Sequence, residues 1–191
     1  MLKGIHPILS PEALHAIASM GHGDELLIAD GNYPAAAKAK RLIRFDGHPI
    51  SLILAGLLDL FPLDSFIAQP IILMDVPEDV ENPPVWEEYR NIITKKDVLF
   101  SRSAAPTPTP AAASALINAP TPTPAAASEL ADSLTSATTG RSWENSVEHL
   151  ERFAFYKRAD DCFAVFASGE TALYANIILK KGVLKKEDLA L

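Results

Sequence analysis

The chain has 191 residues, 48% of them hydrophobic and 21% charged, which is typical of one globular domain. Its formal net charge of −7 disfavours nucleic acid as a partner, because an acidic surface repels phosphate groups. No segment has the roughly 18 apolar residues needed to cross a bilayer, and the single cysteine, Cys162, fits a reducing compartment. We therefore expect a cytoplasmic protein that binds neither nucleic acid nor membrane.

The first predicted elements are a helix and a strand. Ser10 and Pro11 predict a helix start, since serine caps the first turn and proline fits the first helical position. Gly21 marks the end of this helix. The wholly apolar run 26–29 that follows predicts a central strand covered on both faces.

Further helices and one further strand are predicted before residue 100. Helices are expected over residues 49–61 and 84–93, and a short helix or an irregular segment over 35–40. A strand is expected over 66–74. Because Pro70 cannot donate a hydrogen bond to a sheet, we place this strand at an edge or next to a bulge.

The segment 101–142 differs from the rest of the chain in composition. One decapeptide rich in proline, threonine and alanine occurs twice, at residues 105–114 and 119–128. Alternating prolines remove backbone donors, and small side chains offset little of the entropy lost on ordering. We interpret the segment as a disordered insertion that expands a surface loop.

Order is expected to return at Trp143. The apolar run 162–167 predicts a strand in which Cys162 is a buried structural thiol rather than a reactive nucleophile. Residues 1–100 and 143–183 together then form one domain, and 184–191 a tail. Helices that alternate with apolar strands predict an α/β fold.

The loop Gly21-His22-Gly23-Asp24 is the first candidate for chemistry. Glycines permit unusual backbone angles, and a histidine displayed between them can act as a general acid or base near neutral pH. The alternative interpretation is an exposed loop histidine without a role.

Asp30 follows the predicted central strand, where open α/β sheets bind ligands. An Asp-Gly turn held by side-chain-to-backbone bonds is the alternative. His22 and Asp30 lie before and after one strand, and a strand of five or six residues spans roughly 17–20 Å. The two side chains therefore share a site only if the strand is shorter or if two subunits contribute to the site.

Two residue pairs downstream suit a polar ligand. Arg152 and Tyr156 lie four apart, whereas Tyr174 and Asn176 lie two apart and would share one face of a strand. A tyrosine and an amide on one face suit a sugar, although the polar outer face of an edge strand would look the same. The five histidines show no metal-ligand spacing and no nucleotide-binding motif occurs, so we expect neither metal nor cofactor.

Several separated motifs, in order, resemble the L-fucose mutarotase and D-ribose pyranase family. The matching segments are Met20-Gly21-His22-Gly23-Asp24-Glu25, Asp30 with Tyr33-Pro34, Pro62-Leu63-Asp64-Ser65, Arg152-Phe153-Ala154-Phe155-Tyr156 and Tyr174-Ala175-Asn176-Ile177. The resemblance covers nearly all of residues 1–100 and 148–183. The insertion 101–142 departs from the family pattern.

The resemblance implies a three-layer α/β/α domain and a ring-shaped homo-oligomer with active sites near subunit contacts. It implies that His22 is the general acid/base and that four residues contact the sugar, namely Asp30, Arg152, Tyr174 and Asn176. We add the inference that Asp24 orients His22.

The implied activity is cofactor-free exchange between the α and β anomers of L-fucose or a related monosaccharide. The segment 152–156 is fucose-type, which favours fucose over ribose. The alternative is a non-catalytic monosaccharide-binding protein of the same fold.

Overall fold

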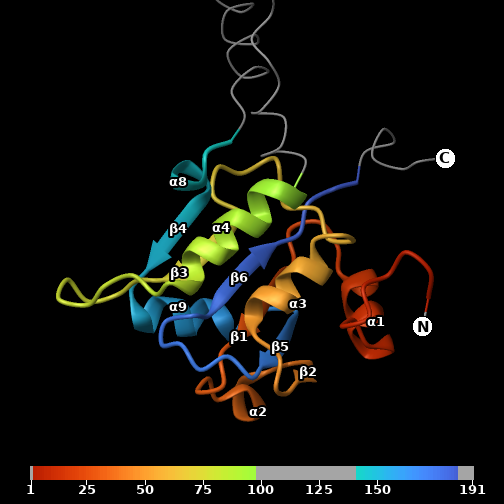
Figure 1. The fold of residues 1–191 in the computed structure, drawn as a ribbon, viewed down its shortest axis with the longest axis horizontal. Helices are drawn as coiled ribbons and strands as arrows, with labels where there is room; N and C mark the ends of the chain where they lie inside the picture. The colour runs from red at the N-terminus through yellow and green to blue at the C-terminus, as the bar shows by residue number, and fades with distance from the viewer. Residues whose placement is uncertain (1, 98–140, 185–191) are drawn as a thin grey trace, which may run out of the picture.

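The chain forms one six-stranded sheet flanked by helices (Figure 1). The structure is a computed structural model that describes residues 2–97 and 141–184. The described helices are α1 (Pro11–Ser19), α2 (Ala35–Lys38), α3 (Ile50–Leu57), α4 (Val85–Lys96), α8 (Trp143–Ser146) and α9 (Arg152–Ala159). The strands are β1 (Glu25–Ala29), β2 (Leu42–Phe45), β3 (Ile71–Met74), β4 (Val147–Leu150), β5 (Ala164–Ser168) and β6 (Ile177–Lys180).

The strand order is β2-β5-β1-β6-β3-β4, and the sheet is mixed. Strands β2, β5 and β1 run parallel, β6 is antiparallel to both β1 and β3, and β3 is parallel to β4. In register, Leu27 lies between Val165 of β5 and Ile178 of β6. The prediction of a central strand over 26–29 is confirmed.

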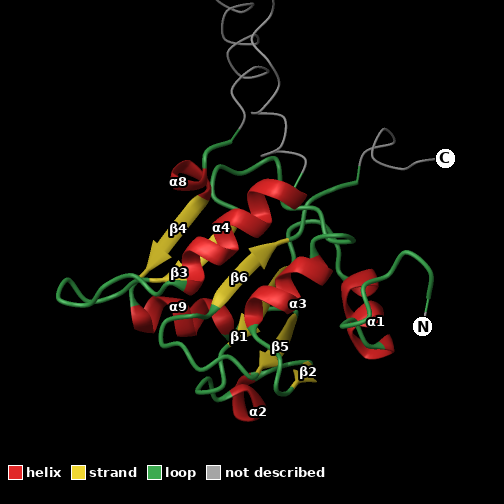
Figure 2. Ribbon diagram, in the orientation of Figure 1, coloured by secondary structure: helices red, strands yellow, loops and turns green. Residues whose placement is uncertain are grey.

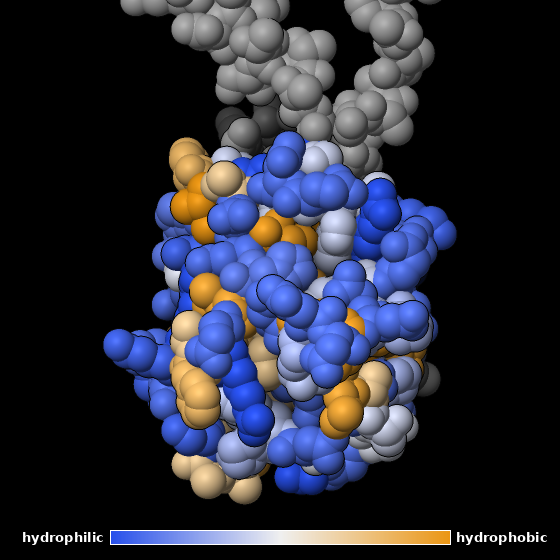
Figure 3. Space-filling view, turned by 90° about the vertical axis from the view of Figure 1, so that its left-hand side faces the viewer, coloured by the Kyte–Doolittle hydropathy of each residue, from blue (hydrophilic) through white to orange (hydrophobic). Residues whose placement is uncertain are grey.

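Alternating side chains of the sheet build two apolar layers. Leu26 and Ile28 point into a cluster with α1, α3 and α4, whereas Leu27 and Ala29 point into a cluster with α2 and α9. Figure 2 shows helices on both faces of the sheet. The predicted three-layer α/β/α domain is confirmed. On the side where β4 lies, the surface is largely hydrophilic with separate hydrophobic patches (Figure 3).

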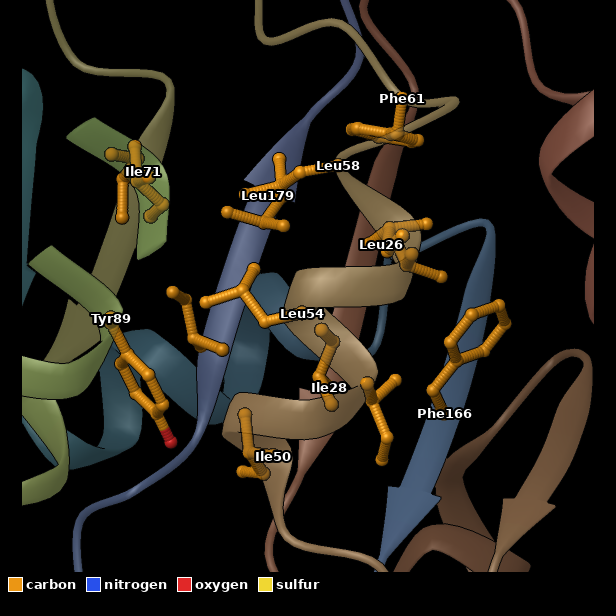
Figure 4. Packing of buried hydrophobic residues seen from close by; sticks show 14 of the residues in the cluster. Leu26, Ile28, Ile50, Leu54, Leu58, Phe61, Ile71, Tyr89, Phe166 and Leu179 are labelled. Atoms are coloured by element: carbon orange, nitrogen blue, oxygen red, sulfur yellow. The ribbon is translucent and has the colours of Figure 1, made fainter. Parts of the chain in front are cut away.

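The larger apolar layer is centred on α3. Figure 4 shows Leu54 of this helix pointing toward β6, which carries Leu179, with Leu26 and Ile28 of β1 near the helix. Pro49 precedes the helix as its N-cap, as predicted, but α3 ends at Leu57 rather than at residue 61. In α1, the Ser10 hydroxyl accepts a hydrogen bond from Ala13 N, which confirms the predicted cap.

The predicted edge position of the strand near Pro70 was wrong. Pro70 precedes β3, which begins at Ile71 and lies between β6 and β4 rather than at an edge. Because Pro70 lies before the strand, its lack of an N–H group costs no hydrogen bond within β3. The Pro70 carbonyl accepts a hydrogen bond from Lys180 N at 2.9 Å. The two edge strands, β2 and β4, were not predicted. Strand β4 has two polar residues among its four, whereas β2 is a short apolar stretch that one arginine interrupts.

The repeated decapeptides and residues 101–140 lie outside the described residues, as does the tail beyond Leu184. Arg141 and Ser142, which the sequence analysis assigns to the insertion, contact the domain. The Ser142 hydroxyl caps α8 by accepting from Asn145 N at 3.3 Å. Among the helices of residues 2–97 and 141–184, none combines the length and the hydropathy needed to cross a membrane.

Candidate active site

The loop that carries His22 connects α1 to β1 and is braced by main-chain bonds. Gly23 N donates to Lys181 O at 2.8 Å, and Lys181 N donates to Asp24 O at 2.9 Å. Gly23 has a φ of +86°, a left-handed conformation that favours glycine. The Asp24 carboxylate accepts from Gly21 N at 2.7 Å, so Asp24 stabilises the loop that displays the histidine.

The carboxylate that contacts His22 belongs to Asp64. His22 Nε2 lies 3.3 Å from Asp64 Oδ1, and the side chains are 47% and 2% exposed, respectively. The same Asp64 oxygen accepts from Phe66 N at 2.9 Å, and the Phe66 ring lies 5.4 Å from the imidazole. Sequence reasoning missed this partner, although Asp64 lies in the matching segment 62–65. An exposed histidine beside a buried carboxylate can exchange protons with a ligand through one ring nitrogen, while the carboxylate orients the other.

Lysine 181 fixes the loop to the end of α1. The Lys181 ammonium donates to Ile17 O and Met20 O, each at 2.7 Å. These are terminal carbonyls of the helix, which carry partial negative charge. Burial lowers the pKa of Lys181, and the neighbouring charge of Asp24 opposes this shift.

A second polar cluster lies at the other end of β1. Asp30 is 5% exposed, and its Oδ1 accepts from Asn32 N at 2.9 Å and from Tyr33 N at 3.0 Å. Its Oδ2 accepts from Asn176 Nδ2 at 2.6 Å, while Asp30 N donates to Asn176 Oδ1 at 3.0 Å. Burial raises the pKa of Asp30, against the lowering effect of these hydrogen bonds. Both oxygens are thus fixed before any ligand arrives.

Tyr174 precedes β6 and has a φ of +57°, so the expectation that it shares a strand face with Asn176 was wrong. Two side chains of α4 hold this stretch of backbone. Trp86 Nε1 donates to Tyr174 O at 3.0 Å, and the Tyr89 hydroxyl donates to Ala175 O at 2.8 Å. Since a left-handed tyrosine is strained, these bonds stabilise its conformation.

Arg152 is connected to the cluster around Asp30 by two aromatic rings, those of Tyr156 and Tyr33. Its guanidinium carbon lies 5.7 Å from the centre of the Tyr156 ring, which stacks on Tyr33 at 5.6 Å. Asp30 and Tyr33 line a cavity of about 250 Å³ together with Gly31, Ala167 and Ser168. This is below the roughly 300–1,000 Å³ of drug-sized pockets, which suits a small ligand.

The structure brings Asp30 and Asn176 together but leaves His22 apart from them. His22 lies before β1 and Asp30 after it, and a strand of five residues spans about 16 Å. Figure 1 shows β1 and β6 running through the middle of the domain between these two ends. One chain therefore holds two separate polar clusters, which we call the His22 end and the Asp30 end. The described residues contain no group of three or more His, Cys, Asp or Glu side chains suited to hold a metal ion.

Comparison with known proteins shows similarity along the whole chain. The sequence matches the RbsD / FucU transport protein family over residues 3–108 and 110–184. It is 36% identical to fucose mutarotase from Bos taurus, over 99% of this chain and 98% of the relative. L-fucose mutarotase from Actinobacillus pleuropneumoniae is 37% identical over 96% and 97%.

The fold is also similar to that of a solved mutarotase. The crystal structure of the fucose mutarotase from Streptococcus pneumoniae in complex with L-fucose aligns with a TM-score of 0.70 and 33% sequence identity. The alignment covers 96% of this chain and 100% of that chain.

Proposed function

Since the chain belongs to the RbsD / FucU transport protein family, we propose that it is a mutarotase that interconverts the α and β anomers of L-fucose or a related monosaccharide. Its full-length relatives named fucose mutarotase support an isomerase of this kind. The single observation that carries the proposal is the contact between the exposed His22 and the buried Asp64.

The His22–Asp64 pair suits anomer exchange. The reaction opens the sugar ring by removing the proton of the anomeric hydroxyl and protonating the ring oxygen, then closes it on the other face of C1. In the neutral tautomer whose hydrogen is on Nε2, the nitrogen beside Asp64, Nδ1 carries the lone pair and can accept the anomeric proton. Buried Asp64 then stabilises the positive imidazolium, which gives this proton to the ring oxygen as the bond between C1 and the ring oxygen breaks. Closure reverses both proton transfers. Neither step requires a metal or a nucleotide.

We further propose that a complete site combines the His22 end of one protomer with the Asp30 end of another, in a ring-shaped homo-oligomer. Asp30, Arg152, Tyr174 and Asn176 would contact the sugar, at a distance from their own His22. Exposed apolar side chains adjoin both ends, as expected of surfaces that become buried. Phe66, beside His22, is 71% exposed, and Phe153 and Leu173, the sequence neighbours of Arg152 and Tyr174, are 77% and 66% exposed.

Saturation-transfer NMR on L-fucose tests the activity, because it reports exchange between the two anomers directly. We expect exchange to be faster with EDTA-treated protein than in buffer. Binding of fucose, ribose or galactose without faster exchange would instead indicate a non-catalytic sugar-binding protein.

Complementation between inactive variants tests the shared site. His22→Ala and Asp30→Ala chains are each expected to be inactive alone. In mixed oligomers, some sites take Asp30 from the first variant and His22 from the second, so activity should return. If each site is formed by one chain, mixing restores nothing.

The unpaired thiol supports a reducing compartment such as the cytoplasm. Cys162 is 1% exposed, and burial raises its pKa to about 12. It therefore has the inert, structural environment that the sequence predicts.

A further inference from the structure

Asp97 and Arg141, the residues on either side of the undescribed segment 98–140, contact the same loop. This loop, residues 63–67, carries Asp64. The Arg141 guanidinium donates to Asp64 O at 2.9 Å, to Ser65 O at 3.1 Å and to Ile67 O. The Asp97 carboxylate accepts from Leu63 N at 3.3 Å. The two side chains thus bind four backbone groups of the loop, one N–H and three carbonyls.

This loop determines where the Asp64 carboxylate lies. The loop begins against β6, where Asp64 N donates to Lys180 O at 3.0 Å and Gly182 N donates to Pro62 O at 2.8 Å. Beyond Asp64, the chain bends so that Phe66 N reaches Asp64 Oδ1. The carbonyls of Ser65 and Ile67 flank this bend, and Arg141 joins them to the carbonyl of Asp64 itself.

An arginine suits this position for a geometric reason. Three carbonyls converge on one guanidinium, whose planar fork presents several donors in fixed directions, whereas a lysine ammonium is a compact point charge. Burial lowers the pKa of Arg141, and the charges of Asp97 and Asp64 oppose this shift. The guanidinium is therefore attracted by the carboxylate of Asp97 while it binds the loop.

We propose that Arg141 is a positioning residue for the His22–Asp64 pair, acting with Asp97 through the backbone of residues 63–67. The inference rests on the proposed function, since it assigns His22 and Asp64 the proton transfer. Arg141 itself touches neither His22 nor the sugar in this account. Its loss moves Asp64 away from the imidazole while leaving the Asp30 end intact.

The first test compares Arg141→Gln with the matched control Arg41→Gln. Arg41 also donates to a backbone carbonyl, Phe163 O at 3.1 Å, but at the start of β2. We expect Arg141→Gln to lower kcat about 10- to 100-fold with KM changed less than about twofold, because small misplacements of reacting groups are costly. The control should keep the wild-type kcat. A folded Arg141→Gln protein with wild-type kcat would overturn the proposal.

A double-mutant cycle distinguishes positioning from a general structural effect. In an Asp64→Asn background, Arg141→Gln should cost almost nothing more, since the group it positions is already disabled. In a Tyr174→Phe background, the two losses should multiply, because Tyr174 lies at the Asp30 end. Equal losses in both backgrounds would show that Arg141 acts on the whole fold.

Hydrogen exchange gives a readout that does not depend on activity. Amides of residues 63–67 should exchange faster in Arg141→Gln, while those of residues 30–33 should not change. Arg141→Lys is the substitute if the glutamine variant fails to fold, and the same loss is expected because lysine cannot bridge three carbonyls. If the wild-type protein does not speed the interconversion of sugar anomers, the proposed function is refuted. If the loop amides of Arg141→Gln exchange hydrogen no faster than those of the wild type, this inference alone is refuted.

Discussion

The two ends of β1 are built differently. At the Asp30 end, the Asp30 carboxylate is buried and both its oxygens are already hydrogen-bonded to Asn32, Tyr33 and Asn176. At the His22 end, the imidazole ring is half-exposed, and the fixed parts are the loops around it. In the proposed function, the first arrangement presents a rigid surface to the sugar, and the second leaves a side chain that can transfer a proton. Stability and proton transfer should therefore respond differently to mutation at the two ends.

The largest expected effect is that of His22→Ala on turnover. Removing the acid/base should lower anomer exchange by about 10²–10⁴-fold, the usual contribution of one such group. The unfolding free energy should change by about 0.5 kcal/mol or less, because the ring is half-exposed and water can replace it beside Asp64. NMR exchange and thermal melting on the same sample measure both. A stable variant with wild-type exchange would leave His22 as a loop residue without a catalytic role.

At the other end, Asp30→Ala should lower both activity and stability. Truncation leaves the Asn32 and Tyr33 amides and the Asn176 side chain without their buried partner. A lost buried partner costs about 1–3 kcal/mol, so a clear fall in melting temperature is expected. Asp46→Ala is the matched control. The Asp46 carboxylate is exposed, and within the described residues its partner is the exposed Arg44. If both variants melt alike, the carboxylate of Asp30 is not a structural part of the Asp30 end.

The burial of Asp30 also predicts how the unfolding free energy depends on pH. Burial raises the pKa of Asp30, so the folded chain binds this proton more tightly than the unfolded chain does. That contribution to stability is complete below the unfolded pKa of about 3.9 and is lost as the pH rises through the higher folded pKa. An amide at this position does not titrate, so the unfolding free energy of Asp30→Asn should rise relative to that of the wild type as the pH increases through the folded pKa of Asp30. Urea unfolding at several pH values measures this difference, and a constant difference would contradict it.

A smaller effect is expected from Trp86→Phe, which keeps an aromatic side chain but removes the indole N–H that donates to Tyr174 O. The loss should be about 1 kcal/mol of stability, as for one hydrogen bond. Since Tyr174 is held at a positive φ, its side chain should also become less well placed, and KM for the sugar should rise more than kcat falls. Trp143→Phe serves as the control, because Trp143 packs against the same apolar cluster but Trp86 is the tryptophan that donates to Tyr174 O. Equal KM values for the two variants would show that the indole donor has no bearing on the sugar.

The sequence predicted those features that depend on local patterns. Wholly apolar runs marked β1 and β5, and the Ser10-Pro11 cap marked α1, because burial on two faces and capping leave a signal in neighbouring residues. The edge strand β4 was missed, since Glu148 and His149 make it look like a polar loop. His22 and Asp30 were found as candidates in the same way, from glycine-flanked and strand-end positions.

Contacts between distant segments left no such signal. Asp64 meets His22 only because β6 lies beside β1 and positions both loops, and no local pattern records that pairing. The left-handed Tyr174 also depends on tertiary contacts, because its carbonyl is bound by a tryptophan from α4. A period of two residues therefore suggested a strand where the chain instead turns. The sequence therefore indicated candidate residues, but not which of them contact one another.

The smallest expected effect comes from replacing residues 101–140 by a short Gly/Ser linker. Lengthening or shortening a connection changes its closure entropy only slowly, and repeated Pro-Thr segments with small side chains contribute little burial. Melting temperature and anomer exchange should both stay close to wild type. The informative partner variant replaces 101–142 instead, and so removes Arg141 from the Asp64 loop and the Ser142 cap from α8. If the two replacements behave alike, the boundary of the domain lies elsewhere; if only the longer one loses exchange, those two residues belong to the working domain and the His22 end depends on them.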